Sequence, residues 1–163
     1  MPRHILSAVV RSCRPPHWAK NLLILGPVLY AGGPFLVKEL ILTVAAFCFA
    51  ASCGYVVNDW FDIEADRQHP EKSLRPLARS EIGPASAVAL ATALGAASVG
   101  LGLAVNREVA ACVSSYLALS AAYSRWLKHM VLIDVFAIAG LFVLRFIAGA
   151  TATQASISAP VVP

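Results

Sequence analysis

The sequence predicts an all-α fold, a polytopic membrane helical bundle of about five transmembrane helices. The first reason is composition, because 58% of the 163 residues are hydrophobic and only 13% are charged. Soluble domains carry roughly 25% charged residues, and a soluble core of this size could not bury so much apolar side chain. The second reason is length, because the apolar residues fall in runs near the roughly 20 residues that cross a bilayer as a helix. Segments of about ten alternating residues, which membrane strands require, are not seen.

Residues 1–17 form a basic segment ahead of the first apolar run. This segment is too long for the n-region of a signal peptide, and no clear small-x-small cleavage site follows it. The first expected helix covers residues 18–35 and is interrupted by Pro27. The expected spans define a transmembrane domain over residues 18–152, and residues 153–163 are either a tail or the start of a further loop.

Four further apolar runs complete the expected bundle. They cover residues 40–57, 82–105, 109–123 and 132–152. The third expected helix carries Ala87, Ala91 and Gly95 at four-residue spacing, a ridge of small residues that favours close helix packing. The fourth expected helix is unusually polar for a span. Its hydroxyl-bearing side chains include Ser114, Ser115, Tyr116 and Ser120.

Basic residues set the expected orientation across the membrane. Ten Lys and Arg side chains fall on one side if the five spans alternate, and only Lys38 and Arg107 fall on the other. The ten are Arg3, Arg11, Arg14, Lys20, Arg67, Lys72, Arg75, Arg79, Arg125 and Lys128. Short cytoplasmic loops are enriched in Lys and Arg. We therefore expect an integral protein of the cell membrane whose N-terminus and charged loop between the second and third spans are cytoplasmic.

That charged loop begins with the segment NDWFDIEAD, residues 58–66. If the second helix continues through it, the three- and four-residue spacings place Asn58, Asp59, Asp62 and Asp66 on one face, whereas Glu64 lies on another. Carboxylates stacked on one helix face repel one another, so the arrangement indicates a bound cation. Oxygen ligands without Cys or His suit a hard ion such as Mg²⁺, which is usually held by one or two carboxylates plus substrate phosphates.

Basic residues just downstream fit a phosphate ligand, because Arg67, Lys72 and Arg75 could bind the oxygens that the metal leaves free. The residues alone leave a second interpretation open. The segment can equally be a charged cytoplasmic loop that obeys the positive-inside rule. The histidines have no pairwise ligand spacing, and the four cysteines are scattered, so we expect neither residue type to bind metal.

Three polar residues at or within the spans also need an explanation. Arg145 falls near the bilayer midplane, where arginine costs at least about 2.5–3.5 kcal/mol and must face protein or a watery cavity. It either bridges carbonyls or the hydroxyls of the fourth span, or it contacts substrate. Lys20 and Asn21 are either interface anchors together with Trp18 or substrate contacts.

Five segments then carry a family resemblance. They are RPPHWAKN (14–21), NDWFDIEAD (58–66), DRQHPEKSLRP (66–76), YSRWLKH (123–129) and IDVFAIAGLFVLRFIAGA (133–150). In this order they resemble the UbiA prenyltransferase superfamily, and its decaprenyl-phosphate phosphoribosyltransferase branch most of all. The resemblance implies a bundle of about nine helices in which two aspartate-rich motifs hold Mg²⁺ on a diphosphate.

Carried over residue by residue, the resemblance makes Asp59, Asp62 and Asp66 the catalytic and metal-binding residues. The implied substrate-binding residues are Lys20, Asn21, Asn58, Lys72, Arg75, Tyr123, Lys128 and Arg145. The implied reaction is a Mg²⁺-dependent transfer of phosphoribose from phosphoribosyl pyrophosphate to a polyprenyl phosphate. The implied partners are the lipid substrate, the diphosphate-bearing donor and the bilayer, with no nucleic acid; homo-oligomerisation stays open.

The sequence also departs from the family pattern, because no second aspartate-rich loop follows Lys128 and Asp134 is the only later acid. The chain therefore resembles the N-terminal half of the family fold. Two other interpretations remain: a UbiA prenyltransferase that transfers a prenyl group to an aromatic acceptor, and a truncated, non-catalytic membrane relative.

Overall fold

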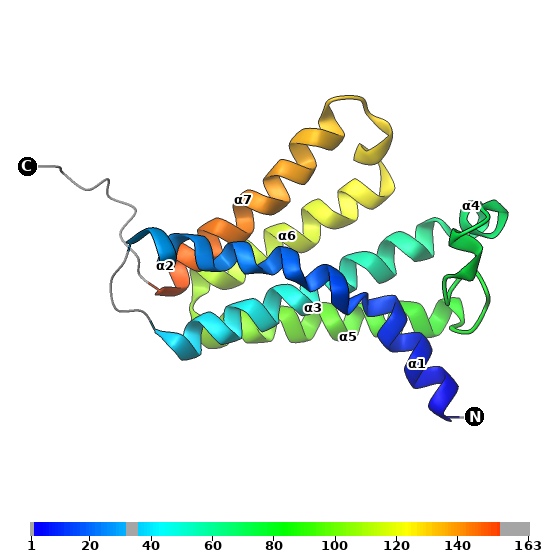
Figure 1. The fold of residues 1–163 in the computed structure, drawn as a ribbon, viewed down its shortest axis with the longest axis horizontal. Coiled ribbons are helices and arrows are strands. Elements are labelled where there is room, and N and C mark those ends of the chain that lie inside the picture. Colours follow the sequence, from blue (N-terminus) through cyan, green and yellow to red (C-terminus); the bar gives the residue numbers. More distant parts are fainter. Residues whose placement is uncertain (1, 32–35, 154–163) are drawn as a thin grey trace, which may run out of the picture.

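The computed structural model describes residues 2–31 and 36–153, and this part of the chain consists of helices joined by turns, without a strand (Figure 1). Its α-helices are α1 (Pro2–Cys13), α2 (Gly26–Ala31), α3 (Val37–Phe61), α4 (Ile63–Gln68), α5 (Pro84–Val105), α6 (Arg107–Arg125) and α7 (Ile133–Thr153). Three 3₁₀ helices complete it: the long η1 (Pro15–Leu25) and the short η2 (Lys72–Leu74) and η3 (Leu127–His129). The expected tail lies outside the described residues, apart from Thr153, which ends α7.

The expected all-α fold is confirmed, and four of the five expected spans match single helices. Helices α3, α5 and α7 are long and apolar enough to cross a membrane. They correspond to the second, third and fifth expected spans. Helix α6 corresponds to the fourth, but its many polar residues keep it out of that group of three. It ends two residues beyond the expected boundary, at Arg125.

The first expected span differs from the prediction, because no single helix covers the described part of residues 18–35. The chain instead forms η1, which begins at Pro15 and Pro16, and then α2, which begins at Gly26. Pro27 has no backbone N–H, so it cannot continue a hydrogen-bonded ladder from η1 into α2. A 3₁₀ helix rises about 2.0 Å per residue against 1.5 Å for an α-helix, so η1 still extends far along the bundle.

Helix α3 lies at the centre of the fold, between α5 on one side and η1, α6 and α7 on the other (Figure 1). The main core joins Phe47 and Ala50 of α3 to Val113 of α6 and Ile24 of η1. Ala148 of α7 closes the same cluster. Burial of these side chains away from lipid and water fixes the positions of the four elements that later carry the site.

Close approach between backbones requires small residues at two contacts. A Cβ on Gly149 of α7 would lie 2.0 Å from the carbonyl oxygen of Ile24, so only glycine lets η1 pack at this distance. On the other side of α3, the Cys53 thiol donates to the Ala91 carbonyl at 3.2 Å, and Ala87 is buried. The predicted small-residue ridge of the third span therefore packs against α3, as close helix packing requires.

The short elements α1, α4 and η2 gather at one end of α3, away from α2 and the start of α3 (Figure 1). Helix α1 contacts α3 and buries Ala8 and Ser12, while Ile5, Leu6 and Val10 stay exposed. Cys13 ends α1, and burial raises the pKa of its thiol, which lowers the fraction of reactive thiolate at this position. All four cysteines are free thiols.

Candidate active site

The aspartate-rich segment lies where α3 passes into α4. The expectation of one continuous helix over residues 58–66 is wrong at Asp62, which has φ −98° and ψ 6° and joins the two helices. The turn keeps helical hydrogen bonds, because the N–H of Asp62 donates to Asn58 at 3.0 Å and the N–H of Asp66 donates to Asp62 at 2.7 Å. The break at Asp62 redirects the chain while the carboxylates stay close to one another.

Each of the three aspartates contacts a cationic side chain of the same chain. Asp59 is only 1% exposed and accepts from Arg14 at 2.6 Å and from Arg75 at 3.2 Å. The same Arg75 nitrogen donates to Asp66 at 2.7 Å. Arg75 therefore bridges two carboxylates and weakens the repulsion between them.

Asp62 belongs to a separate ion pair. It accepts from Lys128 of η3 at 2.5 Å and from the Asn58 amide at 3.1 Å. Glu64 is solvent-exposed and pairs with Arg67 instead, so it points away from this group as the sequence predicts. The Asp62–Lys128 pair links the end of α3 to the turn between α6 and α7.

The donor set fits a hard divalent cation. It consists of oxygen atoms, and Asp59 Oδ2 is buried without a hydrogen-bond partner in the part of the chain that the structure describes. Within residues 2–31 and 36–153, however, no three His, Cys, Asp or Glu side chains already form a metal-binding group. The carboxylates face Arg14, Arg75 and Lys128 instead, so a metal ion would have to share or replace these contacts.

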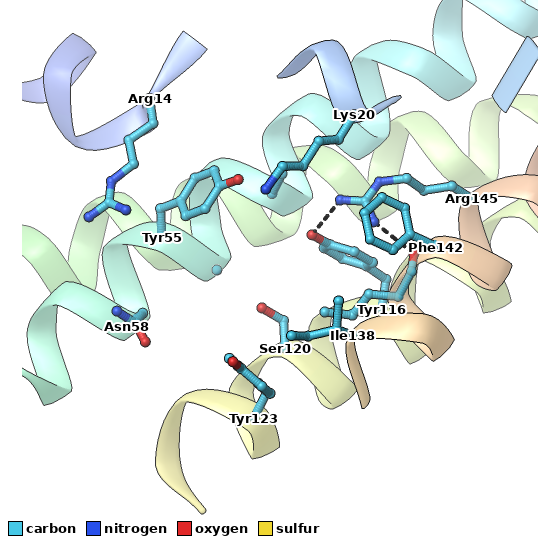
Figure 2. Close-up of a pocket in the computed structure, with 13 residues that line it drawn as sticks. Arg14, Lys20, Tyr55, Asn58, Tyr116, Ser120, Tyr123, Ile138, Phe142 and Arg145 are labelled. Carbon is cyan, nitrogen blue, oxygen red and sulfur yellow. Dashed lines mark hydrogen bonds between the residues drawn. The ribbon is translucent and has the colours of Figure 1, made fainter. Parts of the chain in front are cut away.

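A cavity of about 300 Å³ lies beside the carboxylates, between η1, α3, α6 and α7; we call it the inner cavity (Figure 2). Its polar lining is Arg14, Lys20, Arg145, Tyr55, Tyr116, Tyr123, Ser120 and Asn58. Ile138, Leu141 and Phe142 of α7 form an apolar side. Among the described residues, three cationic side chains and no acidic one line the cavity, so it favours an anionic ligand with an apolar portion.

Arg14 reaches the inner cavity from a turn with unusual backbone geometry. Its φ of 50° and ψ of 58° are left-handed, a conformation that residues other than glycine rarely adopt. This turn between α1 and η1 directs the guanidinium to Asp59 and over the Tyr55 ring, 5.1 Å from the ring centroid. Strained backbone of this kind persists where surrounding contacts hold it, often at functional sites.

Arg145 takes the bridging role that was one of its two expected roles, and it also borders the inner cavity (Figure 2). It donates to the Tyr116 hydroxyl at 2.9 Å, to the Leu141 carbonyl at 2.7 Å and to the Asn21 side chain at 2.8 Å. Asn21 is 1% exposed, and its amide also donates to the Cys48 sulfur at 3.2 Å. This network provides hydrogen-bond partners for the guanidinium of Arg145, which is buried between the helices, and it joins η1, α6 and α7.

The structure divides the sequence-predicted substrate contacts into three groups. Lys20, Asn58, Tyr123 and Arg145 line the inner cavity. Lys72 and Lys128 line a second pocket beyond Asp62. Asn21 lies behind Arg145, and Arg75 lies between Asp59 and Asp66.

Sequence reasoning did not assign Arg14, Tyr55, Tyr116 or Ser120 to the site. Two signals could have found them. Tyr55 precedes Asp59 by four residues on the same helix, and Tyr116 and Ser120 share that spacing within the polar fourth span. Arg14 gave no such signal, because its contact with Asp59 crosses 45 positions of sequence.

Fold and site together define a membrane-embedded helical protein with a cationic cavity beside a row of aspartates. The model of the UbiA prenyltransferase family matches residues 22–163, and the chain belongs to this family. The chain is 37% identical to a decaprenyl-phosphate phosphoribosyltransferase of Corynebacterium glutamicum, over 96% of this chain and 49% of the relative. The same-named protein of Mycolicibacterium smegmatis is 33% identical over 96% of this chain and 52% of its own length. The chain thus spans about half the length of the curated relatives it matches.

Solved structures agree on the fold. A UbiA homologue from Archaeoglobus fulgidus bound to DMAPP and Mg²⁺ superposes with a TM-score of 0.81 at 24% identity, over 91% of this chain and 55% of that one. The apo structure of a UbiA homologue from Aeropyrum pernix K1 gives a TM-score of 0.75 at 21% identity, over 91% and 54%. The described helices therefore have the arrangement found in part of a UbiA bundle.

Proposed function

We propose that this chain forms part of a Mg²⁺-dependent membrane transferase that moves phosphoribose from phosphoribosyl pyrophosphate to a polyprenyl phosphate. The observation that carries the proposal is the inner cavity, in which Arg14, Lys20 and Arg145 meet an apolar wall beside three aspartates. Both substrates of this reaction are anions, and one of them carries a long apolar chain. The identity to phosphoribosyltransferases along nearly the whole chain supports the choice of donor.

The proposed reaction breaks the bond between ribose C1 and the pyrophosphate oxygen. An oxygen of the lipid phosphate forms the new bond to C1, and pyrophosphate leaves with the electron pair. Mg²⁺ bound at Asp59, Asp62 and Asp66 would offset negative charge on the leaving pyrophosphate. Arg75 and Lys128, now held by these aspartates, would turn to phosphate oxygens, with which they form strong charge-assisted hydrogen bonds.

The inner cavity would receive the acceptor. Lys20 and Arg14 supply positive charge for the lipid phosphate, and Ile138, Leu141 and Phe142 would contact the first isoprene units. Placing both anions in a site shielded from water strengthens their interactions with the cationic side chains.

A second candidate is prenyl transfer to an aromatic acceptor. The apolar wall of the inner cavity favours it, as does 35% identity to a 4-hydroxybenzoate octaprenyltransferase of Shewanella, over 63% of this chain and 36% of that protein. Pyrophosphate is the leaving group in both reactions, and the two candidates differ in the group that is transferred from it to the acceptor. A prenyl donor brings its apolar tail, whereas a phosphoribosyl donor brings a polar sugar with a second phosphate.

Labelled donors separate the two candidates. Membranes containing the chain receive Mg²⁺ and polyprenyl phosphate with ribose-labelled phosphoribosyl pyrophosphate, or 4-hydroxybenzoate with a labelled prenyl diphosphate. We expect label from the ribose in the lipid fraction, at a low rate for residues 1–163 alone, because the carboxylates proposed to hold Mg²⁺ all come from one segment, at the end of α3 and in α4, and can enclose a diphosphate only from one side. Label only in a prenylated aromatic product would reject phosphoribosyl transfer, and no product with either donor would reject both activities for this chain.

A further inference from the structure

A second pocket of about 330 Å³ is lined in part by Asp62 and shares no lining residue with the inner cavity among the described residues. We call it the outer pocket. Its lining consists of Asp62, Asp66, His69, Lys72, Lys128 and His129, with one alanine. One hydrogen bond connects the linings of the two spaces: Asn58, which lines the inner cavity, donates to Asp62, which lines the outer pocket. A ligand at the aspartates can therefore extend into the outer pocket.

The charges of the outer pocket favour an anion. Its two carboxylates already have cationic partners, since Asp62 pairs with Lys128 and Asp66 with Arg75. Lys72 has no acidic partner within 4.0 Å among the described residues, and its ammonium group remains available. Asp59, Asp62 and Asp66 together with their partners and Lys72 make three carboxylates against four cations (Arg14, Arg75, Lys72 and Lys128), which leaves a surplus of one positive charge.

Imidazole side chains of the outer pocket supply further hydrogen-bond donors. The Nδ1 atom of His69 accepts from the backbone N–H groups of Glu71 at 3.2 Å and Lys72 at 3.4 Å. An accepting Nδ1 places the ring proton on Nε2, which becomes a hydrogen-bond donor. His129, the last residue of η3, lines the outer pocket together with Lys128.

The same lining argues against a lipid ligand. Apart from one alanine, every side chain of the outer pocket is charged or an imidazole, so an isoprenoid chain would have no apolar contact there. A small water-soluble anion fits this chemistry. The apolar wall that a lipid needs belongs to the inner cavity.

We propose that the outer pocket binds a phosphomonoester, the 5-phosphate that a phosphoribosyl donor carries in addition to its diphosphate. This proposal deepens the proposed function and rests on its choice of donor. Asp62 and Asp66 line the outer pocket, so a donor whose diphosphate lies at the aspartates would reach Lys72, His69 and His129 with its second phosphate. A prenyl diphosphate has no group for this site, which makes the outer pocket a determinant of donor specificity.

Binding of ribose 5-phosphate without Mg²⁺ tests the proposal independently of turnover. The chain in nanodiscs is dialysed against the ³²P-labelled sugar, with ribose and farnesyl phosphate as competitors. We expect saturable binding that ribose does not displace and that farnesyl phosphate displaces only weakly. Because a charged hydrogen bond is lost, Lys72→Gln should raise Kd roughly tenfold, and His129→Gln should raise it several-fold.

Lys38→Gln is the matched control, since it removes the same charge from an exposed position at the other end of α3 and should leave Kd unchanged. Circular dichroism checks that each variant keeps its helices. No saturable binding, an unchanged Kd in both pocket variants, or displacement by farnesyl phosphate at equal concentration would overturn the proposal. If ribose 5-phosphate binds as expected but the chain transfers no phosphoribose, the proposed function is rejected and the phosphomonoester site is supported.

Discussion

At the scale of single residues, the aspartates of the site form ion pairs with arginine and lysine side chains of the same chain. Asp59 and Asp66 lie close enough to share one Arg75 nitrogen, and Asp59 is almost fully buried. A buried carboxylate that loses its partner keeps its desolvation cost without compensation. The arginines and Lys128 therefore stabilise the substrate-free fold, in addition to any role toward phosphate.

Arg75→Gln tests this structural role. Loss of a partner from a buried ion pair costs about 3–5 kcal/mol, and partial exposure of Arg75 lowers our expectation to about 2 kcal/mol of unfolding free energy. The matched control is Arg79→Gln, because Arg79 is exposed and its contact with Glu81 is 3.4 Å long. Denaturant titration in mixed micelles measures both. Equal effects of the two variants would mean that Arg75 does not stabilise the fold through Asp59 and Asp66.

At the scale of helices, hydropathy predicted the boundaries of α3, α5, α6 and α7 within a few residues, because a membrane-spanning helix is visible in the sequence as a run of apolar residues. Local proline chemistry produced the break between η1 and α2, and the sequence indicated it only as an interruption at Pro27. The aspartate spacing predicted a shared face but not the turn at Asp62. The pairing of Asp62 with Lys128 crosses 66 positions, so no periodicity in the sequence could reveal it.

Helix packing at Gly149 gives a sharp prediction for one contact. Gly149→Ala would place a methyl group 2.0 Å from the Ile24 carbonyl oxygen, so α7 must shift away from η1. We expect a loss of roughly 3 kcal/mol of unfolding free energy, the upper end for overpacking. Gly100→Ala is the control, because nothing lies within 4 Å of its added Cβ, and helix propensity should make it neutral or stabilising by up to about 1 kcal/mol. Similar unfolding curves for both variants would contradict the close packing of η1 on α7.

At the scale of the whole molecule, the polar elements gather where the basic residues predict a cytoplasmic face. Helices α4 and η2 follow α3 at this end, and Lys128 reaches it from the turn between α6 and α7. The inner cavity and the outer pocket lie near the same end, where a soluble donor and a membrane lipid can meet. The orientation of this end in the membrane remains a prediction from charge.

Cysteine labelling in intact cells checks the orientation. Single cysteines at Lys38, Arg107 and Lys72, in a chain whose four native cysteines are replaced, probe three exposed positions. An impermeant thiol reagent should label positions 38 and 107 and leave position 72 unlabelled until the cells are opened. If only position 72 were labelled in intact cells, the orientation would be the opposite of the one that we predict.

The most direct test of the site is Mg²⁺-dependent binding of pyrophosphate to the chain in nanodiscs, measured by calorimetry. Asp62→Asn should weaken this binding roughly tenfold, because the substitution removes a charged oxygen from the metal-binding face. Glu64→Gln should bind as the wild type does, since Glu64 is exposed and pairs with Arg67. Pyrophosphate binding that is independent of Mg²⁺, or equally affected by the two substitutions, would contradict a metal–diphosphate site at Asp59, Asp62 and Asp66.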